Sequence, residues 1–379
     1  MSEAGASGGM VLAGFGTSVP DFDAPQSDAA ELHAELSGLD AVRARTLRAL
    51  YRRSGVRRRG SVLLDRPDGA LRDRQDFFRP MADEGDRGPS TADRMERYEL
   101  AAPRLALLAA RRALDDADVE PDRVSHLVTV SCTGFASPGV DAGLVHELGL
   151  SAQVTRTQVG FMGCHGTFNG LRVAHGFTRA DPESVALVCS VELCSLHFAY
   201  GWDPESMVAN ALFADGAGAV ICGGDGSGVA GRSESDGASP WRVTATGTVI
   251  LDDSADDMTW RIGDHGFRMT LSPRVPEVIG RELRPWMTGW LAAAGLTLSD
   301  VASWAVHPGG PRIIDAVGAA LELDRDRTSS AREVLAEHGN MSSATILFIL
   351  QRLRQADAPR PCVALAFGPG LVAEAALIV

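Results

Sequence analysis

Two stretches of the chain share one pattern at a fixed separation. Residues 114–134 read LDDADVEPDRVSHLVTVSCTG, and residues 291–311 read LAAAGLTLSDVASWAVHPGGP. When Leu114 is set against Leu291, an offset of 177, the end of a helix, a turn and a buried apolar strand coincide in both stretches. Because an apolar run that ends in turn residues is typical of a central strand, the sequence predicts an α/β unit that occurs twice.

The same offset holds in two further blocks. GFMGCHGTFNGLRVA (160–174) lies over EHGNMSSATILFILQ (337–351), and VALVCSVEL (185–193) lies over CVALAFGPG (362–370). This alignment sets Cys164 opposite Met341 and Gly163 opposite Asn340. Identities are few, but three blocks at one offset without a gap predict two similar α/β halves, residues 1–225 and 226–379, packed as a pseudo-dimer.

The composition narrows the class of protein. The chain has 379 residues, of which 45% are hydrophobic and 22% charged, a profile typical of a globular protein large enough for two domains. No apolar run reaches the ~18 residues that span a membrane, and the N-terminus lacks the basic start of a signal peptide. We therefore expect a cytoplasmic protein without a membrane partner. A net charge of −13 argues against nucleic-acid binding.

The cysteines indicate thiol chemistry rather than metal binding. All six lie far apart without a C-x-x-C pair, which argues against a zinc ribbon, a redox dithiol or any other metal site; they are at positions 132, 164, 189, 194, 222 and 362. Most are expected to be small buried apolar residues.

One segment reverses the acidic balance of the chain. RARTLRALYRRSGVRRR (43–59) contains eight arginines. It is either a solvated helix face with a basic loop, or a landing site for a polyanionic ligand, since Arg pairs well with phosphate groups.

Three residues form a candidate catalytic set. Cys164 stands among small residues where a helix is predicted to begin, and a helix N-terminus favours the nucleophilic thiolate. His307 ends a predicted strand, and Asn340 begins the matching helix of the second half. Each has a structural alternative: a buried thiol, a structural histidine and a helix N-cap. If the halves pack around a pseudo-twofold axis, the two helix starts face each other and the three side chains converge.

Such a set can join acyl groups. A thiolate takes an acyl group from a thioester, while His and Asn donate hydrogen bonds to the thioester oxygen of a second, malonyl substrate. No metal or organic cofactor is needed. His165 follows Cys164 directly, but neighbours on a helix point ~100° apart, so we expect it to face away from the site.

At this point the motifs resemble a known family. VGFMGC, HPGGPRIID, HGNMSSATILFIL and AFGPG are similar, in order and spacing, to the signatures of type III polyketide synthases, the chalcone synthase family. The resemblance implies a layered αβαβα thiolase fold and a homodimer. It also implies iterative condensation of malonyl-CoA onto a starter acyl-CoA, with CoA thioesters alone, and closure to a pyrone or a phenolic ring.

The resemblance also assigns residues. Cys164 matches the nucleophile, His307 and Asn340 match the decarboxylation pair, Phe213 matches a gatekeeper phenylalanine, and Arg53 matches a residue that holds CoA phosphates. Thr133 and Ser342 match cavity positions. The chain departs from the plant enzymes at several positions: Met269 replaces the second gatekeeper, Cys194 and His197 replace cavity threonines, Trp260 replaces a glycine, and Ser137 replaces the methionine that crosses the dimer.

These departures favour a bacterial type of enzyme. Trp260 should fill part of the cavity and Met269 can move aside, so we expect an aliphatic or malonyl starter and few extensions. If the alignment slips within DDSADDMTWRIGDHG (252–266), Trp260 packs in the core instead. Two other functions stay open: a ketoacyl synthase III-like enzyme that condenses once, and a non-catalytic thiolase-fold protein that binds acyl-CoA.

Overall fold

The computed structural model describes residues 9–229 and 240–379. The expectation that the N-terminus is no signal peptide falls in part on residues 1–8, outside the described residues. Within the described ranges, no helix is both long and apolar enough to cross a membrane.

A mixed sheet of nine strands organises the chain. Its order is β11-β12-β13-β8-β1-β7-β6-β4-β5. The strands of the first half are β1 (Met10–Ser18), β4 (His126–Ser131), β5 (Thr155–Gly160), β6 (Val185–Leu193) and β7 (Asp215–Gly223). Those of the second half are β8 (Arg242–Ile250), β11 (Ser303–Val306), β12 (Cys362–Gly368) and β13 (Val372–Ile378).

The sheet is built twice, as the repeat predicted. Outward from the centre, β1, β7, β6 and β4 mirror β8, β13, β12 and β11. The outer pairs β4–β6 and β11–β12 are parallel, whereas β6–β7 and β12–β13 are antiparallel. The halves join where β1 meets β8 through Met10 opposite Val243 and Val11 opposite Arg242.

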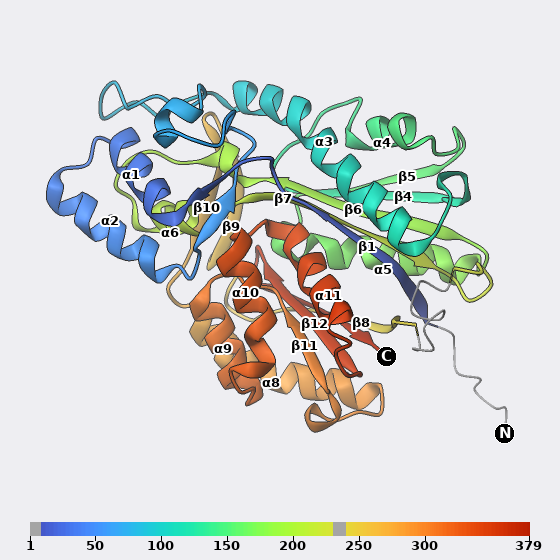
Figure 1. Ribbon diagram of the computed structural model, residues 1–379. Coiled ribbons are helices and arrows are strands. Elements are labelled where there is room, and N and C mark those ends of the chain that lie inside the picture. The colour runs from blue at the N-terminus through green and yellow to red at the C-terminus, as the bar shows by residue number, and fades with distance from the viewer. Residues whose placement is uncertain (1–8, 230–239) are drawn as a thin grey trace.

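Helices cover the sheet in layers (Figure 1). Helices α3 (Thr91–Ala117) and α4 (Val140–Leu148) lie outside the first half, and α8 (Val275–Ala293) and α9 (Pro311–Leu321) lie outside the second. Helices α5 (Gly166–Ala180) and α11 (Thr345–Gln355) lie between the two halves, beside α10 (Ser329–His338). This arrangement confirms the layered, thiolase-like fold.

Small residues let α3 lie very close to β1. The buried face of α3 is a row of alanines, which include Ala109, Ala113 and Ala117. Opposite them, a Cβ atom on Gly16 would lie 2.1 Å from the carbonyl oxygen of Ala109, and one on Gly14 would lie 2.4 Å from the amide nitrogen of Ala117. The helix backbone therefore rests directly on the strand, and glycine is required at both positions.

Two groups of elements lie outside the duplicated sheet and its helices. The first is a lobe formed by β2 (Asp23–Pro25), α1 (Gln26–Leu36), α2 (Ala41–Arg53), β3 (Arg58–Gly60) and α6 (Pro204–Leu212), which lies at one end of the molecule in Figure 1. The second is the hairpin of β9 (Met258–Gly263) and β10 (Gly266–Leu271). Residues 66–89, which composition assigns to a surface loop, also bury Leu71, Gln75 and Phe78.

The ungapped offset of the repeat is only partly right. Ser303 follows His126 by 177 residues, as predicted, but Thr345, the first residue of α11, follows Gly166, the first of α5, by 179. Gly163 and Ser342 each begin a 3-10 turn with a positive φ, 78° and 47°. Cys164 therefore corresponds to Ser343 and not to Met341, because two extra residues precede the second turn.

The close packing of α3 on β1 is testable. Gly16→Ala should lower the free energy of unfolding by ~1–3 kcal/mol, because the helix backbone must move to admit the methyl group. Gly176→Ala is the control: this exposed position in α5 has open space around its Cβ, so alanine should raise stability by ~0.5–1 kcal/mol. Urea titration measures both, and equal stability for Gly16→Ala and the wild type would contradict the packing argument.

Candidate active site

The turn before Cys164 can be made only with glycine. After β5 ends, Phe161 and Gly163 both have positive φ, 61° and 78°. A Cβ atom on Gly163 would lie 2.2 Å from Cδ of Pro369, in the turn between β12 and β13. The amide of Gly163 also donates to the sulfur of Cys132 at 2.9 Å. This turn presses the first half against the second and fixes where Cys164 points.

Cys164 lies in the 3-10 turn Gly163–His165, just before α5. Its side chain is 7% exposed. Burial raises the pKa of the thiol to about 12, the nearby polar side chains of Ser342 and Asn340 lower it, and the charge of Glu192 raises it. The expected lowering of the pKa by the helix start is thus outweighed by burial. The resting thiol keeps its proton, and a base must remove it during attack.

His307 lines the same cavity as this thiol. It follows the last residue of β11, and its amide donates to the carbonyl of Leu365 at 2.8 Å. The side chain is 1% exposed, and within the described part of the chain neither ring nitrogen has a hydrogen-bond partner. Burial lowers the pKa of His307 to about 3, with a smaller effect of His165, so the ring is neutral and carries one donor and one acceptor.

Both backbone groups of Asn340, its amide and its carbonyl, are hydrogen-bonded. Its amide donates to the carbonyl of Leu212, and its own carbonyl accepts from Ala214, both at 2.9 Å, so Phe213 is fixed beside it. The side-chain oxygen accepts from the amide of Ser342 at 2.9 Å. Asn340 therefore makes a turn with Ser342 and does not cap α11, whose N-cap is Ala344. Its Nδ2 is buried and lacks a partner among the described residues.

The three residues line one small cavity of about 360 Å³, including its part open to solvent. Its other walls are apolar; they include Phe213, Met258, Met269, Leu271, Ile313 and Phe367. Unpaired buried donors are costly, so they mark a place for a ligand acceptor. The donors of His307 and Asn340, beside the thiol of Cys164, suit the carbonyl oxygen of a thioester.

A larger cavity adjoins the first. It measures about 1380 Å³, including its part open to solvent, and contains the other expected cavity residues Thr133, Cys194, His197, Trp260 and Ser342. Four residues line both cavities: Cys164, Phe213, Met258 and Met269. Phe213 and Met269 thus stand where a gate was predicted, while Met258 was missed.

The comparisons with known proteins agree with this geometry. Residues 1–226 match the model "Chalcone and stilbene synthases, N-terminal domain", and residues 243–379 match "Chalcone and stilbene synthases, C-terminal domain". The chain belongs to the chalcone and stilbene synthase family.

Its relatives include bacterial enzymes. The "Alpha-pyrone synthesis polyketide synthase-like Pks18" of Mycobacterium tuberculosis is 34% identical over 97% of this chain and 90% of that protein. The 1,3,6,8-tetrahydroxynaphthalene synthase of Streptomyces peucetius subsp. caesius is 35% identical over 98% and 93%.

Solved structures give the same family. PKS-I from the brown alga Ectocarpus siliculosus superimposes with a TM-score of 0.90 at 29% identity, covering 99% of both chains. The tetrahydroxynaphthalene synthase of Streptomyces coelicolor, a bacterial type III polyketide synthase, gives 0.83 at 28%, covering 97% and 98%. The resemblance to type III polyketide synthases, and with it the assignment as an acyltransferase, is confirmed.

An aromatic wall closes one side of the larger cavity in this type III synthase. Trp260 and Met269 are paired across the β9–β10 hairpin, so both face the site, and Trp260 Nε1 donates to the carbonyl of Cys132 at 2.8 Å. His197 stacks on Phe267 with ring centres 4.2 Å apart and meets Trp260 edge-on at 5.4 Å. Trp260 therefore lines the cavity and does not pack in the core.

His197 lines the cavity with the face of its ring and not with a free ring nitrogen. Its Nδ1 accepts from the amide of Phe267 at 3.0 Å, and its Nε2 lies 2.7 Å from the carbonyl of Thr133. Burial lowers the pKa of His197 to about 3, so the ring is neutral with its proton on Nε2. Both ring nitrogens of His197 are thus hydrogen-bonded to the protein backbone and are not available to a ligand.

Some arginines of the segment 43–59 form ion pairs within the protein, and others do not. Arg58 pairs with Asp23, and Arg48 makes a two-pronged pair with Glu31 at 2.6 and 2.7 Å. Arg53, at the end of α2, is exposed and lines neither cavity, and together with Arg52 it has no ion pair among the described residues. Arg52 and Arg53, like the exposed Arg45 on the same helix, are therefore available to meet an anion, and Arg48 is not.

Sequence reasoning missed Glu192. This carboxylate is fully buried and accepts from the amide of Cys132 at 3.0 Å, from Thr133 Oγ1 at 2.7 Å and from the hydroxyl of Ser343. Burial raises its pKa, while these hydrogen bonds lower it in part. It holds the turn around Cys132 and Thr133 against the second half. One signal was available, since it is the only charge in the apolar run VALVCSVEL.

His165 lies where the helix geometry predicted. It lines neither cavity, and its Nδ1 is 2.9 Å from Oδ1 of Asn169. Among the described residues no group of three or more His, Cys, Asp or Glu side chains is placed to hold a metal ion.

The thiol's environment predicts its reactivity. Cys164 should react with iodoacetamide before the other cysteines, because it is the cysteine that lines the small cavity, burial raises the pKa values of Cys132 and Cys194 well above the ordinary range, and the remaining three line neither cavity. Its labelling rate should rise about tenfold per pH unit between pH 7 and 9, since only the thiolate reacts. Peptide mass spectrometry locates the label, and faster labelling of Cys132 or Cys194 would contradict the assignment.

The buried histidine predicts a loss of stability in acid. The pKa of His307 is about 3 in the folded protein against an ordinary value of 6.5, so below pH 6.5 the unfolded chain binds a proton that the folded chain does not. Stability should fall by up to ~1.4 kcal/mol per pH unit for this group alone. His307→Gln removes the effect: between pH 7.5 and 4.5 the wild type should lose ~2–3 kcal/mol more unfolding free energy than the variant. Urea titration measures the unfolding free energy at each pH. If that free energy falls by the same amount with pH in the wild type and in His307→Gln, the buried neutral histidine is contradicted.

Proposed function

We propose that this type III synthase condenses malonyl-CoA repeatedly onto an acyl group held on Cys164, and that the chain then closes to a pyrone or a phenolic ring. The observation that carries this proposal is the small cavity, where a thiol lies beside two unpaired buried donors from the second half. CoA thioesters are the only substrates, and no further cofactor enters the steps below.

The first step loads the starter. The sulfur of Cys164 attacks the carbonyl carbon of an acyl-CoA while its proton passes to the acceptor nitrogen of neutral His307. The new bond is the Cys164 thioester, the bond to the CoA sulfur breaks, and the leaving CoA thiolate takes the proton from His307. A protonated resting thiol fits this route, because nucleophile and base act together.

The second step makes the carbon nucleophile. The malonyl thioester places its carbonyl oxygen against the N–H of His307 and the Nδ2 of Asn340. The bond to the terminal carboxylate breaks, carbon dioxide leaves, and its electron pair forms an enolate whose oxygen the two donors stabilise. The enolate carbon then attacks the Cys164 thioester, and the thiolate leaves to be reloaded.

The relatives illustrate the range of products. Their names describe an alpha-pyrone synthesis enzyme, a tetrahydroxynaphthalene synthase and a 3,5-dihydroxyphenylacetyl-CoA synthase. We propose an aliphatic or malonyl starter for this chain, because Trp260 fills one side of the cavity and Met269 at the gate is flexible. Arg52 and Arg53 would meet the CoA phosphates.

We further propose a cytoplasmic homodimer whose chains each consist of the halves 1–225 and 226–379. Strand β5 supports the dimer: it is an edge strand with largely exposed residues, beside Met162 at 38% exposure, and such an edge needs a cover. The six free cysteines suit a reducing compartment.

The assay that tests the function uses malonyl-CoA with a panel of acyl-CoAs, read by mass spectrometry. Repeated extension supports a type III synthase, a single extension would favour the ketoacyl synthase-like alternative, and binding without product would favour an acyl-CoA-binding protein. Cys164→Ala should lose condensation and keep malonyl-CoA decarboxylation, because both enolate donors remain.

Asn340→Asp provides the complementary variant. It keeps the oxygen that accepts from Ser342 but removes the Nδ2 donor, so decarboxylation should fall by about 10²–10³. His165→Phe is the matched control and should keep most activity, since His165 lines neither cavity. Decarboxylation that survives Asn340→Asp unchanged would remove this residue from the proposed mechanism.

A further inference from the structure

Helix α6 ends next to a residue that lines both cavities of the site. The helix spans Pro204–Leu212, and Phe213 follows it directly. Phe213 forms part of the wall that the small cavity of Cys164 shares with the larger cavity. The way in which α6 ends therefore sets the position of this wall.

The last four carbonyl groups of a helix have no partner within it. In α6, three of the four accept from neutral donors, which are the amide of Phe213, Nε2 of Gln26 and the amide of Asn340. The fourth carbonyl, that of Asn210, accepts from Nη1 of Arg59, and the same nitrogen donates to the carbonyl of Phe213 at 3.0 Å. A cation suits this place, because the C-terminal end of a helix carries partial negative charge.

Arg59 is the one donor to the carbonyl of Phe213 among the described residues. Loss of its guanidinium would leave this carbonyl and that of Asn210 without a protein partner, which is costly. A turn of the backbone that lets the two carbonyls meet water instead would also move the side chain of Phe213. The hydrogen bonds of Arg59 therefore bear on the wall between the cavities.

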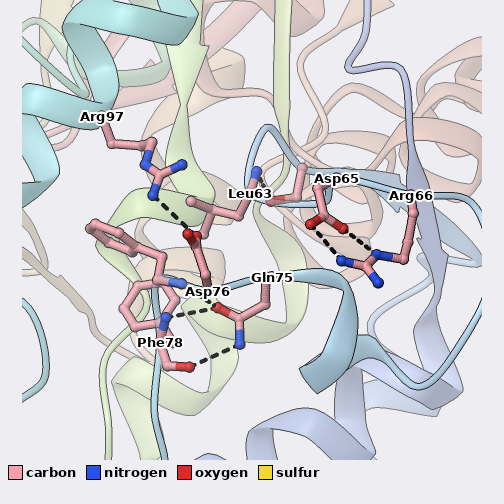
Figure 2. Close-up of polar contacts among 9 residues, drawn as sticks. Leu63, Asp65, Arg66, Gln75, Asp76, Phe78 and Arg97 are labelled. Atoms are coloured by element: carbon pink, nitrogen blue, oxygen red, sulfur yellow. Dashed lines mark hydrogen bonds and ion pairs between the residues drawn. The ribbon is translucent and has the colours of Figure 1, made fainter.

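The partners of Arg59 are unusual for an arginine of this chain. Figure 2 shows the more common arrangement in the loop after β3: Arg66 pairs with Asp65 at 2.7 and 2.9 Å, and Arg97 pairs with Asp76 at 3.1 Å. Arg59 is half-buried and lines the larger cavity, yet it has no ion pair among the described residues. Its charge is directed at backbone carbonyls and not at a carboxylate.

The position of Arg59 is fixed by further contacts. Its guanidinium lies over the ring of Tyr51, 5.5 Å from the ring centre. The preceding segment is tied to the second half, because the amide of Arg57 donates to a carbonyl of α10 at 2.8 Å. A Cβ atom on Gly339 would lie 3.4 Å from the Cβ of Arg59. Arg59 thus lies between the end of α6 and the residue before Asn340.

We propose that Arg59 is a positioning residue for condensation, which acts by holding the Phe213 carbonyl and so keeps the phenyl ring in the wall between the two cavities. This inference rests on the proposed condensing function and adds to it a residue that acts through Phe213.

The position of the wall decides the fate of the enolate. When the wall is in place, the enolate carbon attacks the Cys164 thioester, and the new carbon–carbon bond forms as the bond to the Cys164 sulfur breaks. When the wall is displaced, water reaches the enolate, whose carbon takes a proton, and acetyl-CoA leaves without condensation. Arg59 thereby couples the loss of carbon dioxide to the formation of the carbon–carbon bond.

The test measures both fates of malonyl-CoA in one reaction. Wild type and Arg59→Gln receive isotope-labelled malonyl-CoA and an acyl-CoA starter that the wild type extends, and mass spectrometry quantifies labelled acetyl-CoA and condensed product. Arg59→Gln should raise the ratio of acetyl-CoA to condensed product by about tenfold, the effect of one lost hydrogen bond to a charged donor. The total release of carbon dioxide should change by less than about threefold, because His307 and Asn340 still stabilise the enolate.

Two variants serve as controls. Arg58→Gln is matched, because Arg58 is the neighbouring residue but pairs with Asp23 and lines neither cavity, so the ratio should stay that of the wild type. Arg59→Lys is the conservative variant: both hydrogen bonds of Arg59 come from one nitrogen, and an ammonium group can also donate twice. Its ratio should therefore stay within about threefold of the wild type.

A double-mutant cycle distinguishes positioning from a general loss of structure. Phe213→Leu alone should raise the ratio, because the smaller side chain leaves the wall open. If Arg59 acts through Phe213, the addition of Arg59→Gln to Phe213→Leu should change the ratio by less than about twofold, since effects on a shared contact are not additive. Thermal melting shows whether each variant is folded. Arg59→Met, which keeps a long stem without a donor, replaces Arg59→Gln if the latter does not fold.

The outcomes separate this inference from the proposed function. If the wild type forms no condensed product, the proposed function fails and the inference falls with it. If the wild type condenses but the folded Arg59 variants keep its ratio, or raise only the KM for malonyl-CoA, Arg59 is a structural or CoA-binding residue and the inference alone is overturned. Fully additive effects in the double mutant overturn it as well, because Arg59 then does not act through Phe213.

Discussion

The site depends on one contact between the halves, where the turn before the nucleophile meets the turn between β12 and β13. Gly163 has no room for a side chain against Pro369, and a Cβ on Gly368 would lie 2.3 Å from the ring of His165. The hydroxyl of Thr167 in α5 also donates to the carbonyl of Ser343 at 2.6 Å. These contacts hold Cys164 at a set position relative to His307 and Asn340, which belong to the other half.

The same burial that makes the contact possible sets the chemistry. Removal from water keeps the Cys164 thiol protonated and the His307 imidazole neutral, so neither side chain is charged before substrate binds. The donors of His307 and Asn340 lose their hydrogen bonds to water on folding and regain a partner only when an acceptor enters. These unpaired donors cost stability in the empty protein, and in the proposed mechanism they stabilise the enolate.

The sequence alone predicted much of this arrangement. The duplication, the strands near 125–132 and 303–309 and the final pair around Gly-Pro-Gly follow from apolar runs and turn residues, which are local signals. The convergence of Cys164, His307 and Asn340 was predicted from two helix starts that face each other and a strand end at the same edge of the sheet, and all three line one cavity. The family motifs then placed Phe213, Met269 and Trp260 correctly at the cavity.

What escaped prediction depends on distances between segments. The two extra residues before Ser342 shift the alignment without disturbing either pattern, so an ungapped offset could not detect them. The pKa of Cys164 depends on how much protein surrounds it, and a helix start by itself indicates the opposite direction.

The two ends of the sheet are not equivalent, and this asymmetry limits how copies of the chain can assemble. Strand β11 at one end is fully buried, whereas β5 at the other end is largely exposed and has no counterpart in the second half. A molecule with a single open edge can extend its sheet only once. In the proposed homodimer, pairing of β5 with the β5 of another copy around a twofold axis is isologous and covers the one exposed edge of the nine-stranded sheet among the described residues. Closed point-group symmetry, and not a filament, is the natural end of that association.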